Sequence, residues 1–150
     1  MKRILTVFSV IILGFMLIAC ADLSNVQETQ SDGQISVSIL DVREGQETLF
    51  GELPEGEVWL LIDVAVQNIG QVRRSINTLL MFRLEDETSR YDVDIFAEGA
   101  GALDGDLNVG ERKEATLTFA VSKDSDEFRL LFTPNVNQPG EFEFIIVWND

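Results

Sequence analysis

From residue 35 onward, apolar and polar side chains alternate along the chain with a period of two. Such alternation is typical of extended strands that bury one face and expose the other. Glycine, proline and asparagine residues separate the alternating runs and mark turns. No window shows the period of an amphipathic helix. The pattern predicts seven strands, at residues 35–40, 58–68, 79–84, 90–96, 114–121, 128–132 and 142–148.

The run at residues 58–68 carries the strongest strand signal. Asp63 and Gln67 fall on the polar phase of this run, as expected for a sheet with one wet face. Its apolar phase, predicted to face the core, contains Val58, Leu60, Ile62, Val64 and Val66. Seven short strands within about 115 residues, without helices, predict an all-β fold, an immunoglobulin-like antiparallel β-sandwich.

The first twenty residues have a different character. Lys2 and Arg3 precede an apolar run at residues 4–18. A helix of that length spans about 23 Å, short of the roughly 30 Å bilayer core, and fits a signal peptide better than a stable membrane span. Leu17-Ile18-Ala19-Cys20 resembles the bacterial lipobox. That resemblance implies that residues 1–19 are removed and that Cys20 is lipidated; the alternative is an ordinary signal peptide or short anchor with an incidental cysteine.

The segment after Cys20 is polar, lacks aromatic residues and shows no period. It predicts a flexible tether over residues 20–33, counted from the lipidated cysteine, and a sandwich domain over residues 34–150. Ala21 follows the cysteine and Asp22 comes one position later than an inner-membrane retention signal would place it. The predicted location is therefore the cell envelope: the outer membrane of a Gram-negative cell, otherwise the outer face of the cytoplasmic membrane.

Charge and composition exclude several functions. The chain has 26 acidic and 11 basic residues, and loss of Lys2 and Arg3 would leave a net charge near −17. Such a protein repels nucleic acid and anionic lipid headgroups, so only a covalent lipid on Cys20 is expected to hold it at a membrane. The sequence has no histidine and one cysteine, which excludes histidine-based triads, internal disulfides and thiolate zinc clusters.

Four short motifs follow one another between the predicted strands: Asp63-Val64-x-Val66-x-Asn68-x-Gly70, Phe82-x-Leu84-Glu85-Asp86 with a later Tyr91, Leu107-x-x-Gly110-Glu111, and Ala115-x-Leu117-x-Phe119-x-Val121. This arrangement resembles a family of immunoglobulin-like lipoprotein domains of unknown function, found in bacteria and archaea and akin to a secreted mycobacterial antigen. The resemblance implies a fold and a location but no catalytic residues. Residues 86–89 depart from the family pattern, which often has a glycine turn before the tyrosine.

Two features could bind a cation. Asp104, Asp106 and Asn108 have the spacing that opens a calcium loop, but Val109 and Ala115 stand where its glycine and bidentate glutamate belong. The other reading of this stretch is a turn before a strand. The acidic runs at residues 85–87 and 124–127 are either solvated loops or a weak divalent-ion site.

Five apolar residues lie on the outward phase of their strands: Trp59, Leu61, Leu131, Ile145 and Val147. They form an exposed binding patch if those faces are open. The alternative, which we favour, is that these strands are covered on both sides. Residues 142–148 are aggregation-prone as an edge strand, so pairing or coverage of this segment is expected.

The sequence therefore predicts a lipid-anchored binding or structural module with an unidentified protein or envelope partner, without enzymatic activity or a cofactor. The alternative is a lipoprotein that binds a cation or small ligand through its acidic loops. A hydrolase is disfavoured, since no nucleophile has a visible partner.

Overall fold

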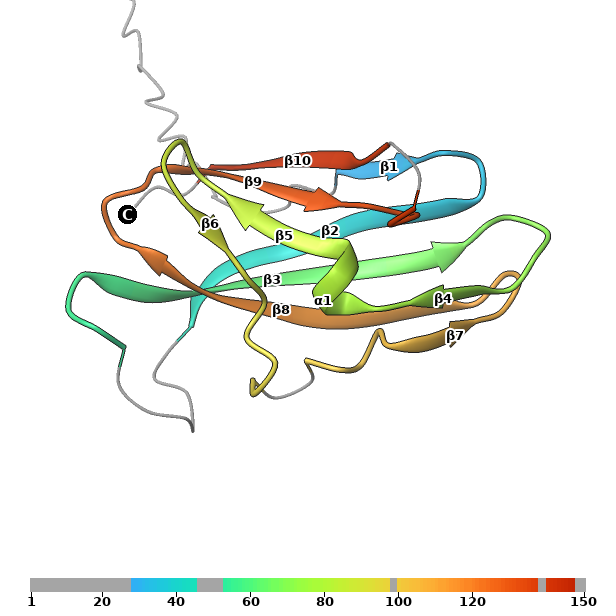
Figure 1. The fold of residues 1–150 in the computed structure, drawn as a ribbon, viewed down its shortest axis with the longest axis horizontal. Coiled ribbons are helices and arrows are strands. Elements are labelled where there is room, and N and C mark those ends of the chain that lie inside the picture. The colour runs from blue at the N-terminus through green and yellow to red at the C-terminus, as the bar shows by residue number, and fades with distance from the viewer. Residues whose placement is uncertain (1–27, 46–52, 98–99, 138–139, 148–150) are drawn as a thin grey trace, which may run out of the picture.

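A computed structural model describes residues 28–45, 53–97, 100–137 and 140–147. Two four-stranded antiparallel sheets pack face to face, with strand orders β1-β2-β3-β8 and β10-β9-β5-β6, and β4 and β7 form a separate two-stranded ribbon (Figure 1). This arrangement confirms the predicted antiparallel β-sandwich. The elements are β1 (Thr29–Ser31), β2 (Ile35–Gly45), β3 (Glu57–Asn68), β4 (Arg74–Ile76), α1 (Thr78–Met81), β5 (Phe82–Glu85), β6 (Arg90–Tyr91), β7 (Gly105–Leu107), β8 (Arg112–Ser122), β9 (Glu127–Phe132) and β10 (Phe142–Val147).

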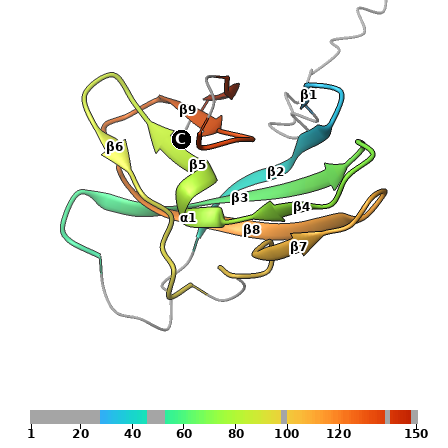
Figure 2. The ribbon, with the colours of Figure 1, turned by 45° about the vertical axis from the view of Figure 1, so that its right-hand side comes forward.

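Hydrogen bonds join the two sheets along both long edges. On one edge, the side-chain amide of Gln30 in β1 donates to the main-chain oxygen of Glu143 in β10. On the other, the Asp94 amide just after β6 donates to the Thr118 carbonyl of β8 at 2.8 Å. Figure 2, turned by 45°, shows β1 and β2 on the side away from β6. Strands β1 and β10 therefore share one edge of the sandwich, and β6 and β8 share the other.

The core forms between the inward faces of the two sheets, as the alternation predicts. In β3, Leu60, Ile62, Val64 and Val66 are fully buried, whereas Val58 at the strand's start is half-buried. The second sheet contributes a chain of aromatic contacts, with the Phe82 and Phe132 ring centroids 4.7 Å apart. The other buried side chains of the core include Ile35, Val37, Ile39, Leu117, Phe119, Val121, Phe128, Leu130, Phe144 and Ile146.

Two of the seven predicted strands are shorter than expected. Residues 79–81 lie in α1, because Asn77 caps the turn by accepting the Leu80 amide at 3.0 Å; only Phe82–Glu85 is a strand. Residues 90–96 form a strand only at Arg90–Tyr91, and a turn follows. In both segments, short-range polar contacts of the backbone override the alternation.

Three short strands have no counterpart in the prediction. β4 and β7 pair with each other, and β1 pairs with residues 36–38 of β2. β1 falls within residues 20–33, the range expected to be tether, so the ordered domain begins before residue 34. The predicted signal peptide and Cys20 lie outside the described residues. Across the described ranges, no helix has the length and apolar character that a membrane crossing requires.

Candidate functional site

Two loops that are far apart in sequence meet at one end of the sandwich. Residues 86–89 connect β5 to β6, and residues 123–126 connect β8 to β9. Both loops carry acidic runs that the sequence singles out. The side chain of Asp86 ties them together, because its carboxylate reaches across to Ser125.

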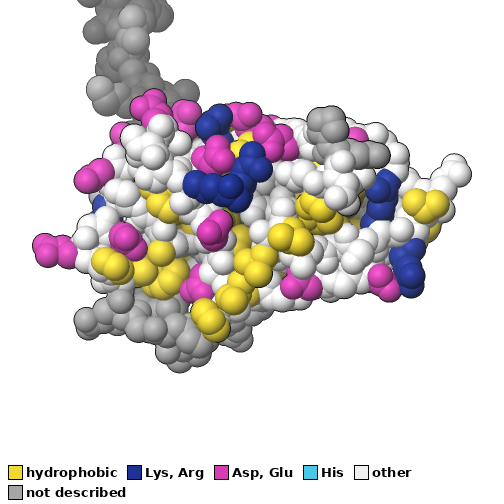
Figure 3. All heavy atoms as spheres, viewed as in Figure 1, with side chains coloured by type: hydrophobic (Ala, Val, Ile, Leu, Met, Phe, Trp, Pro, Cys, Tyr) yellow, Lys and Arg dark blue, Asp and Glu magenta, His cyan; other side chains and the backbone are white. Residues whose placement is uncertain are grey.

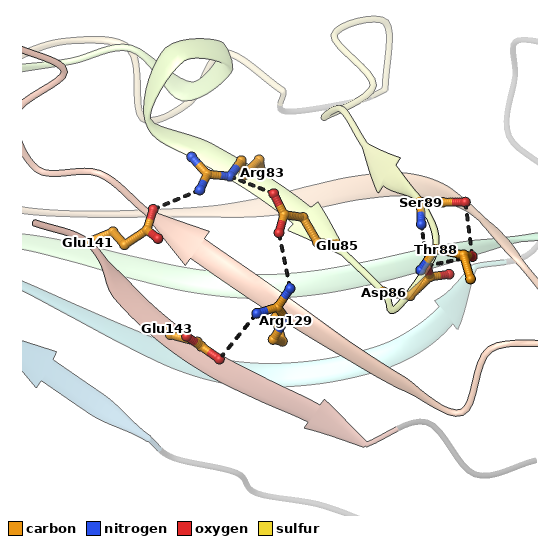
Figure 4. Close-up of polar contacts among 8 residues, drawn as sticks. All are labelled: Arg83, Glu85, Asp86, Thr88, Ser89, Arg129, Glu141 and Glu143. Carbon is orange, nitrogen blue, oxygen red and sulfur yellow. Dashed lines mark hydrogen bonds and ion pairs between the residues drawn. The ribbon is translucent and has the colours of Figure 1, made fainter.

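Asp86 accepts hydrogen bonds from both loops and from a neighbouring strand. Its Oδ1 accepts the Thr88 amide at 2.7 Å and the Ser89 amide at 2.6 Å, which closes a tight turn. Its Oδ2 accepts the Tyr91 hydroxyl and the Ser125 hydroxyl, each at 2.6 Å. We call this arrangement of Asp86, Thr88, Ser89, Tyr91 and Ser125 the Asp86 hub; Figure 4 shows three of its members.

The hub has a clear electrostatic consequence. Burial raises the pKa of the Asp86 carboxyl, but the hydrogen bonds from Ser125, Tyr91 and the two backbone amides outweigh burial and hold that pKa far below its usual range. Burial and the neighbouring carboxylate raise the pKa of Tyr91. Asp86 is therefore a permanent anion at neutral pH, suited to holding loops together and unsuited to accepting a proton as a general base.

A cleft of about 670 Å³ lies beside the hub, bordered by both loops. The structure thus brings the two acidic runs together. The sequence of either run does not predict that they are neighbours. Among the described residues that line the cleft, Arg129 is the basic one. The acidic side chains on its border are Asp86, Glu87, Asp124, Asp126 and Glu127.

An ion-pair network covers the outer face of the second sheet next to this cleft (Figure 4). Arg83 on β5 contacts Glu85 and Glu141, each at 2.9 Å. Arg129 on β9 contacts Glu85 at 3.3 Å and Glu143 on β10 at 4.0 Å. Because these groups remain partly exposed, the network orders the surface and adds little stability.

A smaller network lies on the outer face of the first sheet. The Arg43 guanidinium pairs with Asp41 and Asp63, and the Thr116 hydroxyl donates to Asp63 at 2.6 Å. Burial raises the pKa of Asp63, but the bonds from Arg43 and Thr116 prevail and lower it. These carboxylates are paired within the sheet, so they form no open acid–base pair.

The side chains of the candidate calcium loop do not converge on a common point. The Asp104 carboxylate accepts the amide and the hydroxyl of Thr78, both at 2.7 Å, which fastens α1 to this loop. Asp106 instead pairs with Arg73 at 2.9 Å. The Asn108 side chain donates to Glu111 at 2.8 Å. This stretch therefore forms a turn and a strand, which is the alternative to a cation site, and Gly105–Leu107 is β7.

No metal centre emerges from the side chains that the structure describes. Among residues 28–45, 53–97, 100–137 and 140–147, no three histidine, cysteine, aspartate or glutamate residues are grouped so that they could hold a metal ion. The carboxylates around the 670 Å³ cleft are among these residues and are not grouped in this way.

The five outward apolar residues do not form one patch. Trp59 and Leu61 lie half-buried on the first sheet, with Trp59 on the border of a second cleft of about 770 Å³. Leu131 is buried, although it lies on the outward phase of the second sheet. Ile145 and Val147 of β10 are exposed. Trp59 and Leu61 lie on the outer face of the first sheet, whereas Ile145 and Val147 lie on the outer face of the second. The five residues therefore do not form one exposed binding patch. The favoured alternative, that these strands are covered on both sides, holds for Leu131 but not for Ile145 and Val147.

Other exposed apolar side chains gather where the sequence predicts strands. Figure 3 shows an apolar band over α1 and the segment after β6. The exposed large apolar residues of these segments are Leu79, Leu80, Ile95 and Phe96. The sequence predicts strands over both segments, but the helical turn and the loop leave these four side chains on the surface.

The sequence identifies the acidic loops but not the role of Asp86 within them. The available signal is local: Asp followed by Thr and Ser at the second and third positions is typical of a side-chain-capped turn. Asn68 was also missed as a structural centre. Its buried side chain donates to the Val72 carbonyl at 2.8 Å and to the Leu107 carbonyl at 3.0 Å.

Comparison with known proteins places this geometry in context. The model of a family described as a domain of unknown function, DUF4352, matches residues 24–141. No curated protein sequence matches the chain. The matched range includes both acidic loops and begins before β1.

Several solved structures share the fold. A Bacillus subtilis protein described as a "putative lipoprotein", ycdA, superposes with a TM-score of 0.68 at 21% identity, over 84% of this chain and 40% of its own length. The yjhA protein of the same organism gives 0.60 at 20% identity, over 81% and 97%. An uncharacterized β-sandwich protein from Clostridium difficile gives 0.50 at 13% identity, over 81% and 91%. At these identities, the likeness establishes the fold alone.

Proposed function

The chain belongs to the DUF4352 family, and from that premise we propose that it is an extracytoplasmic lipoprotein whose β-sandwich acts as a binding or structural module without enzymatic activity. The lipid on Cys20 attaches it to the outer membrane of a Gram-negative cell, or to the outer face of the cytoplasmic membrane otherwise. Its partner is a protein or another envelope component. The description of the ycdA protein as a "putative lipoprotein" supports the location.

The observation that carries the module assignment is the Asp86 hub. Asp86 is the described carboxylate whose pKa is most strongly lowered, and its hydrogen bonds hold two loops and a strand together. A carboxylate used in this way contributes shape and rigidity rather than proton transfer. Rigid loops at the end of a sandwich suit the presentation of a surface to a partner, which is an argument from fold-level analogy.

The attachment is tested with Cys20→Ala and with globomycin in cells that express the full chain. Wild-type protein should partition into the detergent phase and accumulate as the uncleaved precursor when globomycin is present. Cys20→Ala should leave the detergent phase or remain uncleaved, whereas the matched substitution Ser24→Ala should behave as wild type. A Cys20→Ala protein that still loses residues 1–19 and still partitions into detergent would overturn the proposal.

A lipoprotein that binds a cation or a small ligand through its acidic loops is the second candidate. Two acidic runs meet at one cleft, although no three of the described carboxylates are grouped as a metal centre. A ligand that binds only the folded state raises the melting temperature. Thermal melts in millimolar calcium and in sodium chloride of equal ionic strength separate specific binding from charge screening. A larger shift in calcium supports the second candidate, and equal shifts reject it.

A further inference from the structure

β10 is an edge strand whose outward main-chain groups can be identified from the ladder. The Thr133 amide donates to the Met81 carbonyl at 2.8 Å, so odd-numbered residues of β9 direct their main-chain groups toward β5. Even-numbered residues of β9 therefore form main-chain hydrogen bonds with β10. The bonded pairs are Phe132–Phe142, Leu130–Phe144 and Phe128–Ile146. It follows that Glu143, Ile145 and Val147 direct their amides and carbonyls away from the sheet.

A second observation gives the same orientation. The Gln30 side chain donates to the Glu143 carbonyl, which it could reach only if that group points outward. Gln30 covers one end of the edge. Ile145 and Val147 lie beyond it, with 40% and 53% of their surfaces exposed.

Parts of the other edges of the sandwich are protected among the described residues. β1 covers the first part of β2, whose register then shifts between Ile39 and Asp41. On the opposite side, Asp94 donates to Thr118 of β8. β10 contains no proline, no lysine and no register shift against β9, which are common devices for blocking an edge. Beyond Glu143 and the Gln30 contact, the outward groups of Ile145 and Val147 therefore lack these blocking devices.

We propose that β10 pairs with β10 of a second copy of this chain, antiparallel and centred on Ile145. In this register, Ile145 lies opposite Ile145 of the second copy, and Glu143 lies opposite Val147. The main-chain groups of all three residues point toward the second copy. The amides of each strand therefore lie opposite the carbonyls of the other along the whole contact. A carbonyl oxygen accepts two hydrogen bonds, so Gln30 does not exclude the pairing at Glu143.

A second copy fits this edge because the strand is self-complementary. No carboxylate lies directly opposite another, and Arg129 lies 4.0 Å from Glu143 within each copy. Contact along an edge also keeps most of the negative surface of two acidic molecules apart. A six-residue contact buries less than the roughly 1,000 Å² of a stable interface, so the association is weak in solution. Attachment to a membrane, which rests on the proposed function, would raise the local concentration.

Ile145→Cys tests the register in the full chain at its native membrane. The two-fold pairing places the two Cα atoms about 5.5 Å apart, within disulfide range. Mild oxidation should convert this variant to a covalent dimer, at least several-fold above the parent chain, whose only cysteine is Cys20. Val147→Cys is the matched control: it is similarly exposed, but its Cα atoms would lie about 14 Å apart, four residues along the strand and across the pair. It should not cross-link alone and should do so when combined with Glu143→Cys.

A further variant separates pairing from random collision. Val147→Pro removes an outward amide, a change that edge strands tolerate, and should reduce cross-linking through Ile145→Cys. Equal cross-linking of the Ile145→Cys and Val147→Cys single variants would overturn the proposal. So would cross-linking of Ile145→Cys only to a different protein. Detergent partition of the parent chain is scored separately, so failure of the anchor and failure of the pairing are distinguishable.

Discussion

At the scale of single residues, Asp86 shows how an acidic position can be structural. It lies in a run of three acidic residues that the sequence treats as a solvated loop or a weak ion site. The Thr88 and Ser89 amides and two hydroxyl groups, from Tyr91 and Ser125, converge on its carboxylate. Its local turn is predictable from neighbouring residues. The bond to Ser125 is not, because that residue lies 39 positions further along the chain.

Asp86→Ala should destabilise the domain by about 1–3 kcal/mol, since it leaves partly buried donors without an acceptor. Urea unfolding followed by tryptophan fluorescence measures the change. Glu87→Ala removes a neighbouring exposed carboxylate and should stay within about 0.5 kcal/mol of wild type. Equal effects of the two substitutions would show that the hub does not stabilise the loops.

At the scale of elements, alternation predicts long strands well and short elements poorly. β3 and β8 follow the pattern, because one face of each is buried against the opposite sheet. α1 does not, because the contacts of Asn77 and Thr78 override a pattern of only six residues. β1, β4 and β7 have three residues each, too few for any period to be detected.

Asp104→Ala should loosen α1 rather than abolish a cation site. The substitution removes the acceptor of the Thr78 amide and hydroxyl, and Thr78 is buried. We expect a loss of about 1–3 kcal/mol that added calcium does not restore. Asp106→Ala breaks only an exposed pair with Arg73 and should cost less than about 1 kcal/mol. A calcium-dependent recovery of Asp104→Ala would return this loop to consideration as a cation site.

At the scale of the whole molecule, two electrostatic effects act in opposite directions as the pH falls. The net charge of −15 at pH 7 opposes compaction, and this repulsion weakens toward the isoelectric point near 4.2. The pKa values of Asp63, Asp86 and Glu111 are lowered in the folded protein. Their stabilisation is therefore complete above the unfolded pKa, about 4, and is lost as the pH falls through the folded values. Overall charge is predictable from composition, whereas the second effect depends on contacts that only the fold creates.

The free energy of unfolding should consequently rise modestly from pH 7 to about pH 5 and fall below about pH 4. Asp86→Asn should flatten the acidic limb, because it removes the group whose pKa is most strongly lowered, whereas Glu87→Gln should leave that limb unchanged. Moderate salt should weaken the rise on the neutral side, since it screens charges more than about 8 Å apart, and should spare the acidic limb, which arises from direct hydrogen bonds. Urea titrations at several pH values and two salt concentrations measure both limbs. Parallel curves for wild type and Asp86→Asn would contradict the assignment of the acidic limb to the hub.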